Sequence, residues 1–532
     1  MPIDPLIVTH HHHCSLEHEP SKETELGSER SDDDTLDLSS SAIRHYFATR
    51  ISSLKELHLK HLSDINPIPA LREMSSHNWN FFFMGMLAWF SASFDFFLTS
   101  VSGTYIAETL NVTTADITWG LSAVLMVRSV GAVIFGLWTD KYSRKWPFIT
   151  TAAMFLVLQI GTGFCKTYQQ FLAVRALSGI AMGGTYATAA ATSLDDSPVK
   201  ARSFLSGLFF SSYAWGMVFA AIFWKAFSGT EKTWKSLFWF SSGFPAILII
   251  WRLVTPETLY FQRVLSARKL IKEEMVEKGL YHKETMKERL QDMKLTMKKY
   301  WILFIYLILL LAGSNFLAHS SQDMFPTMLR KQLEFSEDAI TVAIVITNLG
   351  GVVGSILIGV IQEVLGRRLS IILCCILGGA ITYPAMMIQT NSAVLGACFF
   401  FFFSVLGVWG VIPAHLSELS PPDARVLVSG LAYQLGNLAS SASSTIETRL
   451  AKNWPLEFNS EGVAIKLDYA KTIACFTGAV FVYTLIMTLL GPEKFHRDLS
   501  SPLMKKYIEK VERALDEKKE NGEHSFSSRE FV

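Results

Sequence analysis

Residues 315–327, which read NFLAHSSQDMFPT, place an imidazole, two amides and a carboxylate at the end of a long apolar run. Asn315, His319 and Asp323 are four residues apart, so on a helix they share one face. Gln322 lies one turn beyond His319, on nearly the same face. Ionisable groups are costly at membrane depth and mark substrate or proton sites there. We therefore expect this stretch to carry the function of the protein.

Asp95, Arg128 and Arg175 also lie inside apolar runs. A guanidinium stays charged and its planar fork matches a carboxylate, so Arg128 is predicted to bind an anionic substrate. A structural ion pair between Arg128 and Asp95 is the alternative. Asp95 and Arg175 reach similar depths and can also pair. Such a carboxylate either alternates between charged and protonated forms, as proton coupling requires, or only fixes helix packing.

His319 is predicted to carry a proton near neutral pH or to hydrogen-bond a substrate carboxylate, with a packing role as the alternative. Asp323 is expected to take part in proton coupling or, if it lies beyond the hydrocarbon, to act as an outer-gate or pairing residue. Gln434 and Asn437 are one turn apart within another apolar run. We expect this pair to contact the substrate, although amides in membrane helices also tie helices together.

The elements that must position these residues follow from hydropathy. Half of the residues are hydrophobic and only 18% are charged, compared with roughly 25% charged in soluble domains. Apolar runs of about 18 to 25 residues, long enough to cross a bilayer, occur twelve times. They lie near 80–102, 117–138, 147–165, 170–192, 203–225, 235–254, 300–322, 338–361, 369–388, 393–415, 426–446 and 470–490. The chain is predicted to be an all-α membrane protein with twelve transmembrane helices.

The sequence also repeats itself at a shift of 223 residues. Residues 136–145, GLWTDKYSRK, align with residues 359–368, GVIQEVLGRR, and residues 195–208 align with 418–431 at the same shift. Two matches at one offset indicate two six-helix halves, the parallel-repeat architecture of major facilitator transporters. The predicted segments are a tail (1–78), a first half (79–254), a linker (255–299), a second half (300–491) and a second tail (492–532).

The repeated loops are predicted to form a latch that stabilises one conformation. Their glycines let two helices approach closely, and their acids can accept hydrogen bonds from helix ends and arginines of the neighbouring half. The six latch residues are Gly136, Asp140, Arg144, Gly359, Glu363 and Arg367. The alternative is that these basic loops only set the membrane topology. Ser143 stands where the major facilitator pattern has glycine, and Gly366 fills that position in the second copy.

The N-terminal segment and the distribution of charge predict how the chain is inserted in the membrane. The first 78 residues contain no apolar signal segment, so the first span is expected to direct insertion. Lys and Arg are concentrated in alternate loops, which predicts that both termini are cytoplasmic.

A net charge of +1 gives no indication of nucleic-acid binding. We find no nucleophile elbow, phosphate loop or metal cluster, so we expect no enzyme activity and no cofactor, and a monomer.

Two further motifs resemble the sugar-porter-like branch of the major facilitator superfamily. They are RALSGIAMGG at 175–184 and Pro256-Glu257-Thr258 after the sixth span. In proton symporters of that branch, the residues equivalent to Asp95 and Arg175 are interpreted as a proton-coupling pair. The residues after Glu257 are Thr-Leu-Tyr, where true sugar porters have Ser-Pro-Arg. This departure argues against a sugar substrate.

Residues 315–327 resemble the seventh-span signature of the Jen family of fungal carboxylate:proton symporters. That signature runs Asn, two of any residue, Ser or Thr, His, any, Ser or Thr, Gln-Asp, three of any, Thr. The matching residues are Asn315, His319, Ser321, Gln322, Asp323 and Thr327, and Ala318 departs from it. Arg128 in the second span and the Gln434/Asn437 pair in the eleventh extend the resemblance.

The resemblance implies a plasma-membrane carrier that moves lactate, pyruvate, succinate or malate together with protons. In this hypothesis the substrate carboxylate binds Arg128, while Asp95 or His319 takes up the proton. The residues expected to complete the substrate contacts are Asn315, His319, Gln322, Gln434 and Asn437. Two alternatives remain open, a non-transporting carboxylate receptor and a sugar-porter-like carrier of a neutral substrate.

Overall fold

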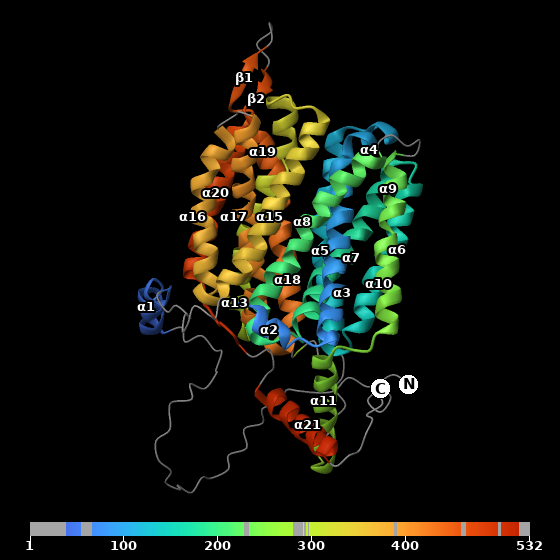
Figure 1. Cartoon of the computed structure of the whole chain (residues 1–532), viewed down its shortest axis with the longest axis vertical. Coiled ribbons are helices and arrows are strands. Elements are labelled where there is room, and N and C mark those ends of the chain that lie inside the picture. The colour runs from blue at the N-terminus through green and yellow to red at the C-terminus, as the bar shows by residue number, and fades with distance from the viewer. Residues whose placement is uncertain are drawn as a thin grey trace.

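The computed structural model describes residues 39–54, 66–227, 233–279, 291, 294–295, 297–387, 391–458, 464–497 and 502–520. Parts of the expected tails and linker, including residues 1–38, 280–290 and 521–532, lie outside the described residues. Long helices run side by side along the vertical axis of Figure 1. They form two groups with a shared interface.

Six spans make up the first half of the bundle. Several begin at a side chain that caps the free backbone N–H groups of the first turn, as Ser75 and the Thr113–Asp116 capping box do. The helices are α3 (Ser76–Val101), α5 (Thr114–Lys141), α6 (Lys145–Phe164), α7 (Tyr168–Leu194), α8 (Arg202–Phe227), and the pair α9 (Thr233–Ser241) and α10 (Gly243–Val254), which together form the sixth span.

The second half repeats this order. Its helices are α13 (Trp301–Gln322), α15 (Glu337–Leu365), α16 (Arg367–Met387), α17 (Asn391–Leu419), the pair α18 (Arg425–Ser440) and α19 (Ser443–Ala451), and α20 (Tyr469–Leu490). Among the described residues, ten helical segments are long and apolar enough to cross a membrane. The fourth and eleventh spans are not among the ten. α7 is rich in Gly, Ala and Thr, and the eleventh span is interrupted between α18 and α19.

The two halves meet along helices from corresponding positions. α8 packs against α15 and α17, and α5 packs against α18. Glycines make these contacts close. A Cβ atom added to Gly359 would lie 2.9 Å from the Cα of Gly207, so only residues without side chains fit where α8 crosses α15.

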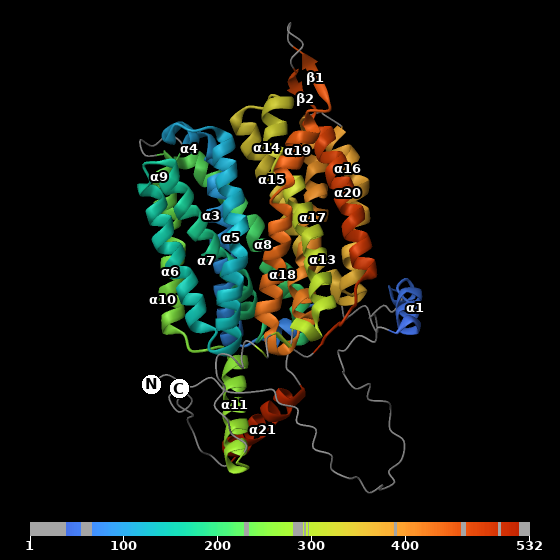
Figure 2. The same ribbon diagram turned by 180° about the vertical axis from the view of Figure 1, so that it is seen from behind.

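Shorter elements mark the two ends of the bundle. We call one end the latch end, because Asp140 and Glu363 lie there, in the last turns of α5 and α15. The helices α11 (Leu259–Glu277) and α21 (Pro502–Glu520) extend beyond this end (Figure 1). The hairpin end carries the antiparallel strands β1 (Pro455–Phe458) and β2 (Ala464–Leu467), seen from behind in Figure 2. The remaining short elements are α1 (Ser40–Ala48), η1 (Ser52–Leu54), α2 (Ile68–Arg72), α4 (Gly103–Leu110), η3 (Val199–Ala201), α14 (Phe325–Thr327), η4 (Met328–Gln332) and η5 (Pro422–Ala424).

Candidate functional site between the two halves

A small cavity lies where the two halves meet, and both halves contribute polar side chains to its wall. Arg128 and Tyr213 come from the first half, and Asn315, His319 and Asn437 come from the second. The cavity volume is about 10 Å³, which is the space of roughly one water molecule. In this conformation the site is therefore nearly closed.

Arg128 is the charged residue of this wall. Its side chain is buried, with Nη2 2.7 Å from the sulfur of Met182 and the guanidinium 4.9 Å from the centroid of the Phe96 ring. Its Nε has no hydrogen-bond partner within the described part of the chain. The glycine motif in α7 explains this placement, because a Cβ atom on Gly183 would collide with the backbone carbonyl of Arg128. α7 can thus pack directly against the turn that carries the arginine.

Asp95 pairs with Arg175. Nη1 and Nη2 of Arg175 donate to the two carboxylate oxygens at 3.0 and 2.9 Å, and both side chains are fully buried. The alternative ion pair between Asp95 and Arg128 does not form. Within the described residues, Arg128 makes no ion pair with any carboxylate.

The polar face of α13 is divided between the cavity and the hairpin end. Asn315 and His319 line the cavity. The Nδ1 atom of His319 lies 3.3 Å from Oδ1 of Asp323, whose side chain is 33% exposed. Gln322 does not line the cavity, because it lies at the end of α13 beyond the His319 turn, and its Nε2 has no partner in the described residues. The polar residues expected on one face of this helix are therefore divided, since Asn315 and His319 line the cavity and Gln322 and Asp323 lie toward the hairpin end.

The two amides of α18 also differ in their contacts. Asn437 lines the cavity and its Nδ2 lies 3.4 Å from Oε1 of Gln434. Gln434 instead donates to the backbone carbonyl of Gly183 at 3.5 Å, in the other half. Gln434 does not line the cavity, because this contact turns its amide toward α7. It ties the halves together and holds Asn437.

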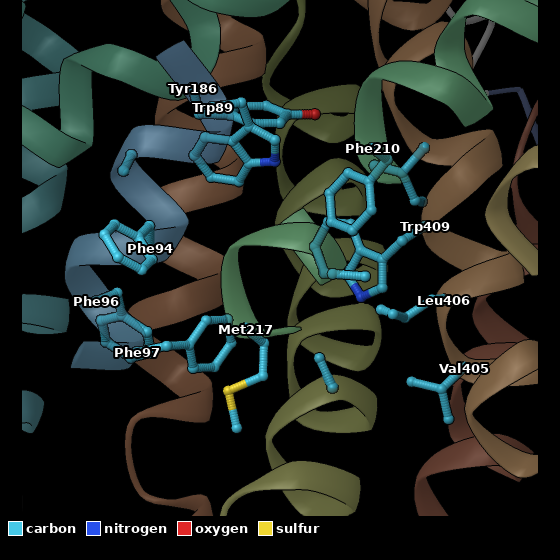
Figure 3. Close-up of a cluster of buried hydrophobic side chains, with 14 of the residues drawn as sticks. Trp89, Phe94, Phe96, Phe97, Tyr186, Phe210, Met217, Val405, Leu406 and Trp409 are labelled. Atoms are coloured by element: carbon cyan, nitrogen blue, oxygen red, sulfur yellow. The ribbon is translucent and has the colours of Figure 1, made fainter. Parts of the chain in front are cut away.

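Most of the remaining wall is aromatic, and no sequence motif predicted these side chains. Phe210 and Trp409 lie next to each other in Figure 3, and their rings stack across the halves with centroids 4.8 Å apart. Tyr186 and Tyr433 stack at 4.1 Å. Since 12% of all residues are aromatic, no spacing in the sequence distinguishes these rings from others. Their contacts exclude water around the polar groups.

At the latch end, the first copy of the repeated loop contacts the second half. The carboxylate of Asp140 accepts hydrogen bonds from the backbone N–H groups of Val426 (3.2 Å) and Leu427 (2.8 Å), in the first turn of α18. A Cβ atom on Gly136 would lie 2.8 Å from the Cα of Leu427. Arg144 binds Asp195 at 3.1 Å and lies 3.6 Å from Asp140. An acid at a helix N-terminus is favourable for both hydrogen bonding and the helix dipole.

The second copy makes the corresponding contacts with the first half. Glu363 accepts a hydrogen bond from Ser203 in the first turn of α8. Arg367 donates to Glu418 at 3.0 and 2.8 Å, at the position where Arg144 forms an ion pair with Asp195 in the first half. Asp195 also accepts from Arg425 of the second half at 2.7 Å. The structure thus brings all six predicted latch residues into contacts at the latch end.

The linker helix α11 is attached to the same end through a buried acid. Asp196 accepts hydrogen bonds from the backbone N–H groups of Leu259 (2.9 Å) and Tyr260 (2.6 Å) in the first turn of α11. Burial of this carboxyl raises its pKa to about 6, although the two hydrogen bonds oppose the shift. Arg268 of α11 donates to the carbonyl of Lys141 at 2.8 Å. The linker therefore contacts both latch-end loops of the first half.

Comparison with known proteins identifies the family. Residues 65–500 match the family described as Sugar (and other) transporter. The chain belongs to this family. It is 53% identical over 501 residues to the Carboxylic acid transporter protein homolog of Saccharomyces cerevisiae, an alignment that covers 93% of this chain and 81% of that protein. The predicted resemblance to the Jen family is confirmed. This family member is also 24% identical to the Probable 4-methylmuconolactone transporter of Cupriavidus pinatubonensis, over 62% of this chain and 75% of that protein.

Solved structures share the fold. The proton:xylose symporter XylE bound to 6-bromo-6-deoxy-D-glucose aligns with a TM-score of 0.63 and 15% identity, covering 82% of this chain and 99% of that chain. The human organic anion transporter MFSD10 aligns with a TM-score of 0.55 and 14% identity, covering 77% and 99%. The predicted twelve-helix major facilitator fold is confirmed. The protein is a multi-pass membrane transporter, and its relatives are transporters rather than enzymes.

Proposed function

We propose that this transporter is a proton-coupled symporter of short-chain carboxylates, such as lactate, pyruvate, succinate or malate. It works in the plasma membrane with both termini in the cytoplasm, where the concentration of Lys and Arg in alternate loops would place them. The observation that carries the proposal is Arg128. It is a buried, permanently charged guanidinium beside a cavity, without a carboxylate partner among the described residues.

A substrate carboxylate suits this site because it supplies the missing charge. Isolated buried charges are unfavourable, and a guanidinium binds a carboxylate through two parallel hydrogen bonds. Asn315, His319 and Asn437 add donors and acceptors from the second half to the same cavity. Gln434 supports Asn437, and Gln322 lies next to His319 outside the cavity. The similarity to the yeast Carboxylic acid transporter protein homolog supports the same class of substrate.

Transport requires the cavity to open alternately to the two sides. A cavity of about 10 Å³ is too small for an acid of several heavy atoms, so one wall must move before the substrate enters. The contacts of Asp140 and Glu363 hold the latch end together in this conformation. We infer that substrate enters from the hairpin end, and that breaking the latch opens the site to the cytoplasm.

Proton uptake offsets the charge of the substrate. Two titratable arrangements are near the cavity, His319 with Asp323 and Asp95 with Arg175. The first reaches from the cavity wall toward the hairpin end. The second holds its carboxylate in an ion pair in this conformation, so Asp95 would take a proton only if the pair opened during the transport cycle.

The experiment is uptake of labelled lactate and labelled succinate at pH 5 and pH 7.5, in cells that lack their own carriers, with and without a protonophore. Uptake of either acid that rises at pH 5 and collapses with the protonophore supports the proposal and gives the substrate class. Binding without accumulation would instead indicate a receptor. Competition by glucose, with none by lactate or succinate, would indicate a carrier of neutral substrates.

A further inference from the structure

Glu447 is a buried acid that the proposed transport mechanism has not used. It lies in α19, the part of the eleventh span nearest the hairpin end, and its side chain is fully buried. Neither of its carboxyl oxygens has a hydrogen-bond partner within the described part of the chain. α19 packs against both α13 and α20.

The surroundings of Glu447 do not stabilise a negative charge. From α13, Asp323 acts on Glu447 by charge repulsion. On α20, Lys471 and Cys475 are exposed, as is Arg449 on α19 itself. Burying an ionised carboxylate without a partner is so costly that the group neutralises instead. The Glu447 carboxyl is therefore expected to hold a proton in this conformation.

Glu447 is also connected to the candidate site through α13. Asp323 contacts His319 at 3.3 Å, and His319 lines the cavity. Two further buried polar atoms without partners, Nε2 of Gln322 and Oγ of Ser443, belong to the same pair of packed helices. Ser443 is four residues before Glu447, so both lie on one face of α19. These polar groups therefore lie on two helices that pack together, and one of them, His319, lines the cavity.

We propose that Glu447 is the proton-binding site that couples proton movement to substrate transport. This inference rests on the proposed symport function and names the residue that carries the proton. A proton from the outer medium binds the ionised Glu447 carboxylate, forms one O–H bond and leaves the side chain neutral. The neutral form is stable in the conformation closed at the latch end. After the halves rearrange, the O–H bond breaks and the proton leaves through Asp323 and His319 to the cytoplasmic side.

The test uses Glu447→Gln, which has the shape of the protonated side chain but cannot release a proton. Glu108→Gln, at an exposed position in α4, is the matched control. Three measurements are made on the full-length protein in proteoliposomes or detergent. They are accumulation of the labelled acid driven by a pH gradient, exchange of labelled for unlabelled acid without a gradient, and the infrared absorption of protonated carboxyl groups at neutral pH.

We expect Glu447→Gln to lose pH-driven accumulation while retaining exchange, because exchange requires no net proton movement. The infrared band of a protonated carboxyl should be present in the wild-type protein and the control, and reduced in the variant. Wild-type-like accumulation by Glu447→Gln, or an unchanged infrared band, would overturn the assignment. If the wild-type protein itself shows no pH-driven accumulation, the symport proposal fails, whereas the infrared result still reports whether Glu447 holds a proton.

Folding is checked separately so that loss of protein is not mistaken for loss of coupling. Glu447→Met removes the carboxyl and keeps a side chain of similar length. If Glu447 binds a proton, both variants should reach the membrane and show uptake that no longer differs between pH 5 and pH 7.5. If uptake by the Met variant differs between pH 5 and pH 7.5 as much as uptake by the wild type does, the proposal is wrong.

Discussion

Arg175 donates one hydrogen bond to each carboxylate oxygen of Asp95, at 3.0 and 2.9 Å, and both residues are fully buried. This pairing has a consequence for a third residue. Since Asp95 is engaged, Arg128 remains beside the cavity with a sulfur atom and an aromatic ring as its contacts. Of these two arginines, Arg175 is therefore neutralised and Arg128 can bind an anion.

Arg128→Lys should reduce carboxylate uptake by about 10- to 100-fold, because an ammonium cannot form the two parallel hydrogen bonds of a guanidinium, each worth roughly 1.5 to 3 kcal/mol. Initial uptake rates, normalised to surface protein, measure the effect. Arg330→Lys is the control, since Arg330 is exposed and pairs with Glu337. Uptake by Arg128→Lys at the wild-type rate would contradict the assignment of Arg128 to the substrate.

Asp95→Asn should destabilise the protein by about 3 to 5 kcal/mol, because it leaves the buried Arg175 guanidinium without its counter-charge. Thermal unfolding of the purified transporter measures the loss. The double variant Asp95→Leu, Arg175→Met should recover much of it, since both charges are removed together. If Asp95→Asn were as stable as the wild type, the pair would contribute nothing to the fold.

Gly207→Leu should abolish transport without removing the protein from the membrane. A Cβ atom on Gly207 would lie 2.8 Å from the Cα of Gly359, so a leucine cannot fit while the halves are closed at the latch end. The protein would be held in conformations open at this end. Gly379→Leu is the control, because a Cβ atom there meets nothing within 4 Å. Equal uptake by the two variants would show that closure at this crossing is unnecessary.

Asp196→Asn should change how stability depends on pH. The pKa of Asp196 is raised from 3.8 to about 6, so between these values the folded protein binds a proton that the unfolded chain releases. The protonated Asp196 therefore stabilises the folded protein. This stabilisation is fully present below about pH 4 and is lost as the pH rises through 6. The free energy of unfolding falls by about 3 kcal/mol over this pH range because of Asp196. The Asn variant cannot titrate at this position, so it does not show this fall.

The measurement is the free energy of unfolding, or the Tm in detergent, at several values between pH 4 and pH 7. We expect the wild type to lose more stability than Asp196→Asn over this range. Glu108→Gln, at an exposed position, controls for general effects of removing an acid. Parallel curves for the wild type and Asp196→Asn would mean that Asp196 titrates in the folded protein as it does in the unfolded chain.

Local sequence was sufficient to predict the spans, the fold and the family. A transmembrane helix requires about 20 apolar residues in succession, so it can be recognised from a short continuous segment of the sequence. The repeat at 223 residues predicted two halves, and Asp140 and Glu363 do lie at equivalent positions, in the last turns of α5 and α15, where each contacts the other half. The spacing of Asn315, His319 and Asp323 fixed their common face, because helix geometry relates neighbours in the chain.

Only the tertiary structure decided which polar residues share a cavity. Asp95 pairs with Arg175 and not with Arg128, although all three lie within spans. Gln434 turns to the backbone of Gly183 while Asn437, one turn away, faces the cavity. Glu447 was overlooked because the eleventh span was expected to end at residue 446, one residue before it. The physical reason is the same in each case. Hydropathy and periodicity act within one helix, whereas partners and burial depend on how closely helices distant in sequence pack together.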